Sequence, residues 1–366
     1  MVPPQLPDTM LAVRVEEFHQ PYSLRQIPTP SPSNLGPNDL LLKVGVASYC
    51  HTDSMVIEGE IAKHPQITAS HEAAGTVLAT GSSATDFPVG SRVMVGVPFH
   101  RCGSCAECQG SEEYKQYCTN GDYFGVTTDG GFAEYAIADA REACVLPDAV
   151  GFDTAAPLAC AGCTVWRGVL RADLKEGQWL GIVGAGGGLG HLGVQFAKAL
   201  GLKVVGIDAK DLALELAREC GADVVVDARK GTKEVVEAVK GVTGGEGVEV
   251  AINVSGADEA AALSCAMTRV HGTVIQLAQP TEVKIPYPEL IFRDIRIKGS
   301  LISTKQEAER MLQTVADHNV KVQTNFFFGL EEVPKLVDFV HAGKMAGKGI
   351  VVVDEEEQRR IKQAKH

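Results

Sequence analysis

The chain has 366 residues, of which 45% are hydrophobic and 22% are charged, and its formal net charge is −12. This length exceeds what one hydrophobic core usually supports, so two domains are expected, and the acidic balance argues against nucleic acid as a partner. No apolar run approaches the ~18 residues of a membrane span, which argues against a membrane protein. The start, MVPPQLPDTM, lacks the features of a secretory signal, and ten cysteines without such a signal indicate metal ligands or reduced thiols. We therefore expect a soluble, cytoplasmic protein.

Residues 10–150 have the pattern of short strands separated by turns that Gly and Pro mark. The clearest strands are LAVRV, LLLKVGVA, AAGTVLATG, SRVMVG and FAEYAIA, which are rich in β-branched residues. This part of the sequence predicts a compact, largely antiparallel β domain.

Cys50 and His51 stand side by side in ASYCHTDSMV, directly after one of these apolar runs. A single cysteine is most often a small buried hydrophobe, so on this stretch alone core packing is a stronger explanation than a metal site. Two later stretches add ligand types: ASHEAAG contains His71 and Glu72, and LACAGCT contains Cys160. Two cysteines and one histidine provide three protein ligands and leave a fourth position open, which is the pattern of catalytic zinc.

Four cysteines lie on one polar loop, RCGSCAECQGSEEYKQYC, at positions Cys102, Cys105, Cys108 and Cys118. Four thiolates can close a tetrahedral shell around zinc with no open position, which makes a structural site. Free thiols or a redox pair are the alternatives, although chance clustering of four cysteines is improbable. The sequence therefore predicts a structural zinc lobe over about residues 100–120.

From about Ala161 the pattern changes to short apolar runs that alternate with helix-length segments. The runs WLGIVG, KVVGID, ADVVVD, VEVAINVSG and GTVIQLA are typical of strands buried in a parallel sheet. The helical segments include GHLGVQFAKALG, KDLALELARECG and TKEVVEAVKGV, and several of them end at Gly. This alternation predicts βαβ units and a doubly wound sheet.

The stretch IVGAGGGLGHLG follows a predicted strand and opens a predicted helix, which is the context of a dinucleotide fingerprint. Gly184 can make the tight turn, Gly186 to Gly188 let the backbone approach a pyrophosphate, and Gly190 permits close helix–strand packing. The spacing is one residue longer than the commonest form, so the loop alone also fits a glycine-rich turn without a ligand. Asp208 ends the next strand, where a carboxylate accepts hydrogen bonds from the adenosine ribose and repels a 2′-phosphate. We therefore expect NAD to be preferred over NADP.

After about Ser300 the alternation fades. Two amphipathic segments follow, around KQEAERMLQTVADH and EEVPKLVDFVHAG, and they predict two helices. The final stretch, DEEEQRRIKQAKH, is expected to be a solvated and partly frayed end.

The motifs CHTD, HE-AAG, the four-cysteine lobe, CAG-TV and GGLGHL-VQ-AKA-G together resemble the zinc-dependent medium-chain alcohol dehydrogenases, above all the yeast and bacterial ethanol-dehydrogenase branch. The resemblance covers nearly the whole chain. It implies an α/β protein with a GroES-like, mainly antiparallel β catalytic domain over residues 1–162 and 303–366, and a doubly wound, NAD-binding Rossmann domain over residues 163–302. It also implies two zinc ions per chain, a small alcohol or aldehyde substrate, and a homo-oligomer, either a dimer or a tetramer.

On this resemblance, Cys50, His71 and Cys160 are the ligands of the catalytic zinc, a ligand set already established for alcohol dehydrogenases. Glu72 is then a nearby carboxylate that can exchange onto the metal. Asp53 is the acceptor that orients the His71 ring.

The resemblance also implies a proton relay and a set of coenzyme contacts. Thr52 is the hydroxyl that takes the proton of the substrate, His51 lies near the coenzyme pyrophosphate, and Thr164 lies near the nicotinamide. The other implied coenzyme contacts are Gly184, Gly186, Gly187, Gly188, Leu189, Gly190, Asp208 and Lys348.

Four positions depart from the pattern of this family. The lobe has a longer loop before Cys118 than is usual. Met55 stands where the proton relay often ends in a histidine, and since methionine cannot carry a proton, the relay must finish through His51, the ribose or water. Ser70 replaces the usual Gly before His-Glu. Lys348 stands where a phosphate-binding arginine is common, and it keeps the charge without the planar fork.

The substrate is the least determined part of the prediction. In the ethanol-using enzymes bulky aromatic residues narrow the pocket, whereas here the corresponding regions place Ile61 and Val97 there. This favours a longer, branched or aromatic primary alcohol, unless Phe99 or another side chain fills the space. The alternatives are a secondary-alcohol or ketone reductase on the same scaffold, a zinc-free reductase of the quinone or enoyl type, and a non-catalytic protein that binds NAD and zinc. His71, Cys160 and the complete lobe disfavour the zinc-free reductase.

Overall fold

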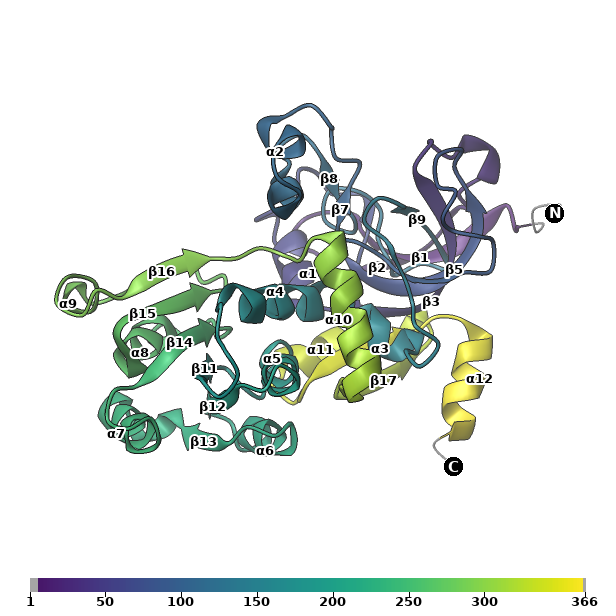
Figure 1. Ribbon diagram of the computed structural model, residues 1–366. Helices are drawn as coiled ribbons and strands as arrows, with labels where there is room; N and C mark the ends of the chain where they lie inside the picture. The colour runs from purple at the N-terminus through teal and green to yellow at the C-terminus, as the bar shows by residue number, and fades with distance from the viewer. Residues whose placement is uncertain (1–5, 365–366) are drawn as a thin grey trace. The chain divides into compact units, whose positions relative to one another are not determined.

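The computed structural model describes residues 6–364, which form two compact units (Figure 1). Unit 1 comprises the described residues up to Cys160, then Thr304–Ala316 and the chain from Thr324 onward, and unit 2 comprises Ala161–Ser303 and Asp317–Gln323. The sequence-based division placed the last of these segments with the first domain. It joins unit 2 because the side chain of Gln195 makes two hydrogen bonds of 2.8 Å to the backbone of Lys321. Residues 1–5 and 365–366 of the expected catalytic domain lie outside the described residues.

Unit 1 is built around strand β3 (Asp39–Tyr49), which lies inside a seven-stranded sheet. Its sequence, DLLLKVGVASY, is almost wholly apolar, and every residue except Lys43 is buried. The pairing is antiparallel except between the last two strands. The other strands of this sheet are β5 (Glu72–Thr80), β6 (Arg92–Met94), β9 (Tyr135–Asp139), β10 (Cys144–Val145), β17 (Thr324–Phe328) and β18 (Lys348–Val352).

The register of this sheet brings three distant segments together at the end of β3. Ser48 is opposite Glu72, the first residue of β5, and Tyr49 is opposite Gly349 near the start of β18. Since antiparallel strands run in opposite directions, the end of β3 meets the beginnings of both neighbours. The residue that follows Tyr49 therefore lies close to those that begin β5 and β18.

The rest of unit 1 surrounds this sheet. The remaining strands are β1 (Thr9–Val15), β2 (Ser23–Pro28) and β4 (Ile67–Thr68), which form a small sheet, and the pair β7 (Pro98–Phe99) and β8 (Asp122–Tyr123). The helices are α1 (His51–Ile57), α2 (Ala106–Gln109), α3 (Phe152–Pro157), α11 (Val333–His341), α12 (Glu355–Ala364) and the greater part of α10 (Lys305–His318). Helices α10 and α11 confirm the two amphipathic segments.

The prediction of a frayed C-terminal end is wrong, because most of this segment forms helix α12. The Asp354 side chain accepts hydrogen bonds from the backbone N–H groups of Glu356 and Glu357, at 2.8 and 3.0 Å, and so caps the first turn. The three glutamates of that turn also complement the helix dipole. Ile361 is only 4% exposed and anchors the helix.

Unit 2 is a six-stranded sheet in the order β13-β12-β11-β14-β15-β16, in which every pair is parallel. Helices cover both faces (Figure 1), which confirms the doubly wound Rossmann domain. None of the helices in the described part of the chain combines the length and apolarity that a membrane crossing requires. The strands are β11 (Trp179–Val183), β12 (Lys203–Asp208), β13 (Val224–Asp227), β14 (Val248–Asn253), β15 (Thr268–Gln276) and β16 (Arg296–Gly299), and the helices are α4 (Cys163–Arg171), α5 (Gly190–Ala199), α6 (Asp211–Glu219), α7 (Thr232–Val242), α8 (Ala260–Met267) and α9 (Tyr287–Ile291).

Candidate active site

Four side chains with metal-ligating atoms converge at the end of β3. They are Cys50, His71, Glu72 and Cys160, and their ligand atoms all lie within 4.8 Å of one another. Cys50 directly follows β3, while His71 and Glu72 stand at the start of β5. Cys160 comes from a π-helical turn, Leu158–Gly162, a conformation that is rare and is often found at functional sites. The fold therefore assembles the whole predicted ligand set.

The His71 ring is held from one side only. Its Nδ1 lies 2.9 Å from Oδ1 of Asp53, and both side chains are 1% exposed. The other carboxylate oxygen of Asp53 accepts a hydrogen bond of 2.8 Å from the backbone N–H of Cys50. Nε2 of His71 is buried and has no hydrogen-bond partner among the described residues. A buried nitrogen of this kind beside two sulfurs fits a ligand to a metal ion.

The two cysteine thiols of this cluster shift each other's pKa in opposite directions. A hydrogen bond from Cys160 holds the pKa of Cys50 well below its usual value, against the opposing effect of burial. Burial also acts to lower the pKa of His71, but the Asp53 carboxylate outweighs it and raises that pKa well above the usual value. A thiolate at Cys50 is therefore favoured before any metal binds, and thiolate is the form that ligates zinc.

Glu72 is paired with a lysine from the other side of β3. The Nζ atom of Lys348 lies 3.0 and 2.7 Å from the two carboxylate oxygens of Glu72 and donates to the backbone carbonyl of Tyr49 at 3.0 Å. Burial raises the pKa of Glu72 to about 7, although Lys348 opposes this. Since Lys348 is only 3% exposed and already engaged, its predicted phosphate contact requires one of these bonds to be shared. That contact remains a prediction.

The predicted relay residues lie in the first turn of α1, where side chains are more exposed. Thr52 is half-buried with its hydroxyl 4.0 Å from the sulfur of Cys50, and His51 is exposed. Met55 is half-buried. Within the described part of the chain, the Ser54 hydroxyl forms a hydrogen bond only with the Tyr49 hydroxyl, at 2.8 Å, so this serine does not extend the relay.

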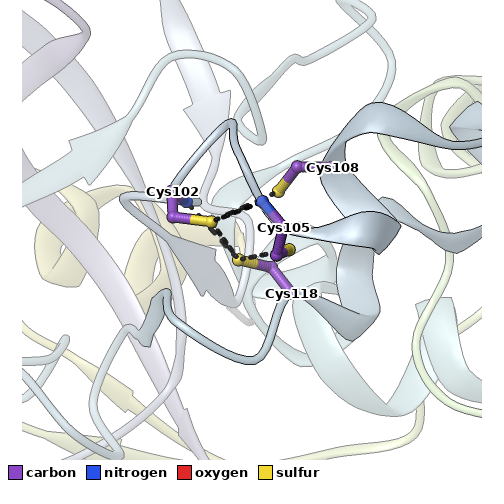
Figure 2. A group of neighbouring side chains, drawn as sticks. All are labelled: Cys102, Cys105, Cys108 and Cys118. Carbon is purple, nitrogen blue, oxygen red and sulfur yellow. Dashed lines mark hydrogen bonds between the residues drawn. The ribbon is translucent and has the colours of Figure 1, made fainter.

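The four cysteines of the lobe also come together (Figure 2). The sulfur of Cys118 lies 3.6 Å from that of Cys102 and 3.8 Å from that of Cys105, and the sulfurs of Cys102 and Cys108 are 4.0 Å apart. These cysteines are not disulfide-bonded. Sulfurs at the corners of a zinc tetrahedron with bonds of about 2.3 Å lie roughly 3.8 Å apart, so the spacing fits zinc.

The extra length of the loop before Cys118 has a structural explanation. A 3₁₀ helix, Glu112–Tyr117, takes up these residues and ends directly before Cys118. The Ser111 side chain caps this helix by accepting a hydrogen bond from the N–H of Glu113. As a result, the Cys118 sulfur lies beside the sulfurs of the other three cysteines. It also accepts a hydrogen bond of 3.4 Å from the N–H of Cys102.

The glycine loop joins β11 to α5 in unit 2. Gly184 has a φ of +92°, and a Cβ on Gly186 would lie 1.9 Å from the carbonyl oxygen of Ala213, so both positions require glycine. The next three residues of the loop, Gly187 to Leu189, are half-buried. A Cβ on Gly190 would lie 2.0 Å from the Gly184 carbonyl, as close helix–strand packing predicts.

Asp208 stands beside this loop at the end of β12. One of its carboxylate oxygens accepts a hydrogen bond of 3.0 Å from the N–H of Gly186, and the other accepts one of 2.8 Å from the N–H of Ala209. The side chain is half-buried. Because strand order reverses beside β11, this edge of the sheet is where doubly wound folds bind nucleotides. Thr164, the predicted nicotinamide contact, is half-buried in α4 of the same unit.

Sequence reasoning missed two residues that support these sites. His191 is fully buried in α5, where its Nδ1 lies 2.9 Å from the carbonyl of Gly187 and its Nε2 accepts from the N–H of Gln323 at 3.2 Å. Tyr22 donates from its hydroxyl to the backbone carbonyl of Asp53 at 3.0 Å. The contacts of His191 with Gln323 and of Tyr22 with Asp53 join residues distant in sequence, and no local pattern signals them.

Comparison with known proteins agrees with this architecture. Residues 36–148 match the family model "Alcohol dehydrogenase GroES-like domain", and residues 188–317 match "Zinc-binding dehydrogenase". Alcohol dehydrogenase 1 of Emericella nidulans is 32% identical over 355 residues, which cover 96% of this chain and 99% of the relative.

Two solved structures extend this likeness. The acetophenone reductase of Geotrichum candidum, solved with NAD, is 25% identical with a TM-score of 0.81, and the match covers 95% of this chain and 98% of that one. A protein of Sinorhizobium meliloti assigned as a zinc-binding dehydrogenase, solved with NADP, is 30% identical with a TM-score of 0.82, covering 94% and 99%. The chain belongs to the zinc-dependent medium-chain alcohol dehydrogenase family.

Proposed function

We propose that this alcohol dehydrogenase requires zinc and NAD, and that it interconverts a primary alcohol and its aldehyde. The observation that carries the proposal is the buried Nε2 of His71, which has no hydrogen bond and shares its site with two cysteine sulfurs. An imidazole nitrogen and two sulfurs form a donor set suited to zinc. Cys50, His71 and Cys160 would hold the ion and leave one position for the oxygen of the substrate.

Zinc bound there supplies a Lewis acid that lowers the pKa of an alcohol oxygen. The residues around it hold and move the proton. Asp53 would keep the proton on Nδ1 of His71, while the Nε2 proton that the raised pKa favours would be displaced on metal binding. Thr52 takes the proton of the alcohol through its hydroxyl, and the neighbouring His51, which is exposed, passes it to water.

Glu72 provides a carboxylate beside the metal ligands and can exchange onto the ion. Its pairing with Lys348 supports this role, because the lysine balances the charge of the carboxylate inside a buried site. If Glu72 exchanged onto the ion, Lys348 would keep its hydrogen bond to the Tyr49 carbonyl. One donor of its ammonium group would then be released for the predicted coenzyme phosphate contact.

NAD would bind at the glycine loop of unit 2. The preference for NAD over NADP rests on Asp208, whose carboxylate would accept from the ribose hydroxyls and repel a 2′-phosphate. The two solved relatives contain NAD in one case and NADP in the other, so family membership alone does not decide the coenzyme.

The lobe would hold a second, structural zinc ion. The sulfur spacing of 3.6–4.0 Å supports this assignment, since free thiols have no reason to adopt the spacing of a zinc tetrahedron. The total would be two zinc ions per chain.

The substrate would be a longer, branched or aromatic primary alcohol. Of the residues that define the expected pocket, Ile61 is 38% exposed, whereas Val97 and Phe99 are both 8% exposed. No tryptophan or tyrosine stands at either of the first two positions. Preference for a ketone over an aldehyde would favour the secondary-alcohol alternative.

We also propose that the protein is a homo-oligomer. Strand β16 is an edge strand of the unit 2 sheet, and all four of its residues are exposed. Beside it in sequence, Tyr287, Ile291 and Phe292 are 65%, 69% and 74% exposed. An unpaired edge next to exposed apolar side chains fits pairing with a second copy. The cytoplasmic location stays a prediction.

The decisive experiment combines metal analysis with turnover on enzyme purified without chelator. We expect two zinc ions per chain and NADH oxidation with aldehydes, tested from acetaldehyde through cinnamaldehyde to bulky ketones. The Cys50→Ala variant should lose one zinc ion and its turnover while keeping its circular dichroism spectrum. Cys220→Ala is the matched control, since Cys220 lies in unit 2. Turnover retained by Cys50→Ala would refute the proposal.

A further inference from the structure

A small cavity beside the four-cysteine loop takes no part in the chemistry described above. Its volume is about 130 Å³, well below the ~300 Å³ at which sites for drug-sized ligands begin, so it suits an ion or a very small molecule. All of its walls belong to unit 1: the loop after β7, the 3₁₀ helix Glu112–Tyr117, the segment after β9, and the first turn of α10. We call it the lobe cavity.

Four cationic side chains line the lobe cavity. Three of them are ion-paired, Arg101 with Glu142, Lys115 with Glu112 and Arg141 with the buried Asp139. Lys305 has no carboxylate partner among the described residues, so its positive charge is the local excess. Arg101 binds Glu142 through Nε, and its two terminal nitrogens make no hydrogen bond within the described part of the chain. Lys305 donates to the carbonyl of Ala140 at 3.0 Å, which uses one of its three donors. In a chain with a net charge of −12, this local excess of positive charge favours an anionic ligand.

Gln116 provides a second and independent observation. This side chain also lines the cavity, and the residue is only 2% exposed. Both its amide nitrogen and its amide oxygen are buried without a hydrogen-bond partner among residues 6–364. Since buried polar groups are nearly always bonded, this amide indicates a missing partner that can both accept and donate.

The position of α10 adds to the attraction for an anion. Lys305 and Gln306 belong to the first turn of this helix of 14 residues, and both line the cavity. The N-terminus of a helix carries a partial positive charge. Thr304 already accepts from the N–H of Glu307, and the Glu307 carboxylate accepts from the N–H of Thr304, so the helix adds only part of this charge to the cavity.

We propose that the lobe cavity binds hydrogen phosphate or a similarly small phosphate species, held by Arg101, Lys305 and Gln116. The phosphate oxygens accept from the two cations and from the amide N–H, while the remaining P–OH donates to the amide oxygen. Sulfate, which has the same shape but no such proton near neutral pH, satisfies only part of this set. Because Gln116 lies on the helix that ends directly before Cys118, the bound anion joins this part of the lobe to α10.

The test is isothermal titration calorimetry of the metal-loaded enzyme with inorganic phosphate and with sulfate, at ionic strength held constant with sodium chloride. We expect saturable phosphate binding that is several-fold tighter than sulfate binding. Lys305→Met should weaken phosphate binding at least tenfold, and Gln116→Leu should remove the preference for phosphate. Lys335→Met is the matched control, because Lys335 lies on α11 with its side chain 70% exposed.

Hydrogen exchange gives a second measurement. Phosphate should slow amide exchange over residues 112–118 in the unaltered enzyme and in Lys335→Met, but not in Gln116→Leu. Phosphate affinity that is the same in Lys305→Met and in the control would place the ion elsewhere, for example at the glycine loop, and overturn the proposal. Binding no stronger than that of chloride, or equal affinity for sulfate and phosphate, would likewise contradict it.

Discussion

The buried carboxylate of Asp53 decides the orientation of the His71 ring. It contacts His71 Nδ1 with one oxygen and the Cys50 N–H with the other, at 2.9 and 2.8 Å. Because both side chains are 1% exposed, water does not compete for these bonds, and they are stronger than they would be at the surface. One residue thus fixes two of the three proposed zinc ligands.

We predict that Asp53→Asn weakens zinc binding at the catalytic site by about 10–100-fold, as is usual when the partner of a metal-binding histidine is lost. The asparagine keeps the volume but can donate to Nδ1, which favours the tautomer whose Nε2 carries the proton. Competition with a chromophoric chelator measures the affinity. Asp338→Asn makes the same chemical change at an exposed position and should have no effect. Unchanged zinc affinity in Asp53→Asn would show that the carboxylate does not orient the ligand.

Ser70 has an uncommon backbone conformation next to the proposed metal ligands. Its φ is +73°, a region that non-glycine residues rarely adopt, and its hydroxyl donates to the Ser48 carbonyl at 2.9 Å. The hydroxyl bond therefore offsets the strain that glycine would avoid.

The strained backbone of Ser70 predicts that the glycine variant at this position is more stable than the alanine variant. Ser70→Ala should lower the free energy of unfolding by about 1 kcal/mol, because it loses the buried hydrogen bond and keeps the strain. Ser70→Gly loses the same bond but relieves about 1 kcal/mol of strain, so it should be nearly neutral. Urea unfolding of the two variants with the same metal content measures the difference. A glycine variant that is less stable than the alanine variant would contradict this explanation.

At the scale of secondary structure, the sequence predicts unit 2 best. The segment TKEVVEAVKGV matches α7 (Thr232–Val242). Its apolar residues have helical spacing, and the strands predicted before and after it also indicate a helix between them. Strand β16 (Arg296–Gly299) is missed, since it has only four residues and all of them are exposed. The π-helical turn at Cys160 has no sequence signal either. The pairing of Lys348 with Glu72 depends on strand register across 276 residues, which composition and spacing do not reveal.

The end of β12 carries the prediction about the coenzyme. Asp208→Ala removes the carboxylate that would bind the ribose and repel a 2′-phosphate, so the ratio of kcat/KM for NAD to that for NADP should fall at least tenfold. Asp208 also holds the loop through the N–H of Gly186, and Asp208→Asn is the control because it keeps an acceptor there. The asparagine variant should lose discrimination while keeping more of its activity with NAD. A ratio that does not change in either variant would exclude Asp208 from coenzyme selection.

We expect the lobe to depend on the proposed zinc ion more than on packing. Of its four cysteines only Cys118 is buried, at 4% exposed, and α2 has no buried residue. We predict that Cys118→Ser lowers the zinc content from two ions per chain to one and speeds amide exchange over residues 100–120, while exchange in unit 2 is unchanged. Metal analysis and hydrogen-exchange mass spectrometry measure both effects, with Cys220→Ser as the control. Two zinc ions retained in Cys118→Ser would show that the site closes without this ligand.

At the scale of the whole molecule, the exposed edge of the unit 2 sheet raises the question of assembly. Ile291 and Phe292 are 69% and 74% exposed beside β16, which pairs with β15 on one side and forms the edge of the sheet on the other. Natural edge strands are normally short, charged or covered. Strand β16 has only four residues, and two of them are the cations Arg296 and Lys298, which disfavour unspecific pairing with another strand. The exposed apolar side chains that precede it in the sequence have no such protection. This combination fits a specific contact between two copies of the chain.

We therefore predict that Phe292→Asp shifts the protein toward the monomer. Burying Phe292 in a contact between copies would stabilise the assembly by about 1.5–3 kcal/mol per side chain, so a buried charge in its place should weaken association at least a hundredfold. Sedimentation velocity over a range of concentrations measures the change. Leu212→Asp is the control, because Leu212 is also an exposed apolar residue of unit 2, at 60%, but lies on α6. A Phe292→Asp variant with the sedimentation coefficient of the unaltered protein, whether monomer or oligomer, would show that this edge is not the contact between copies.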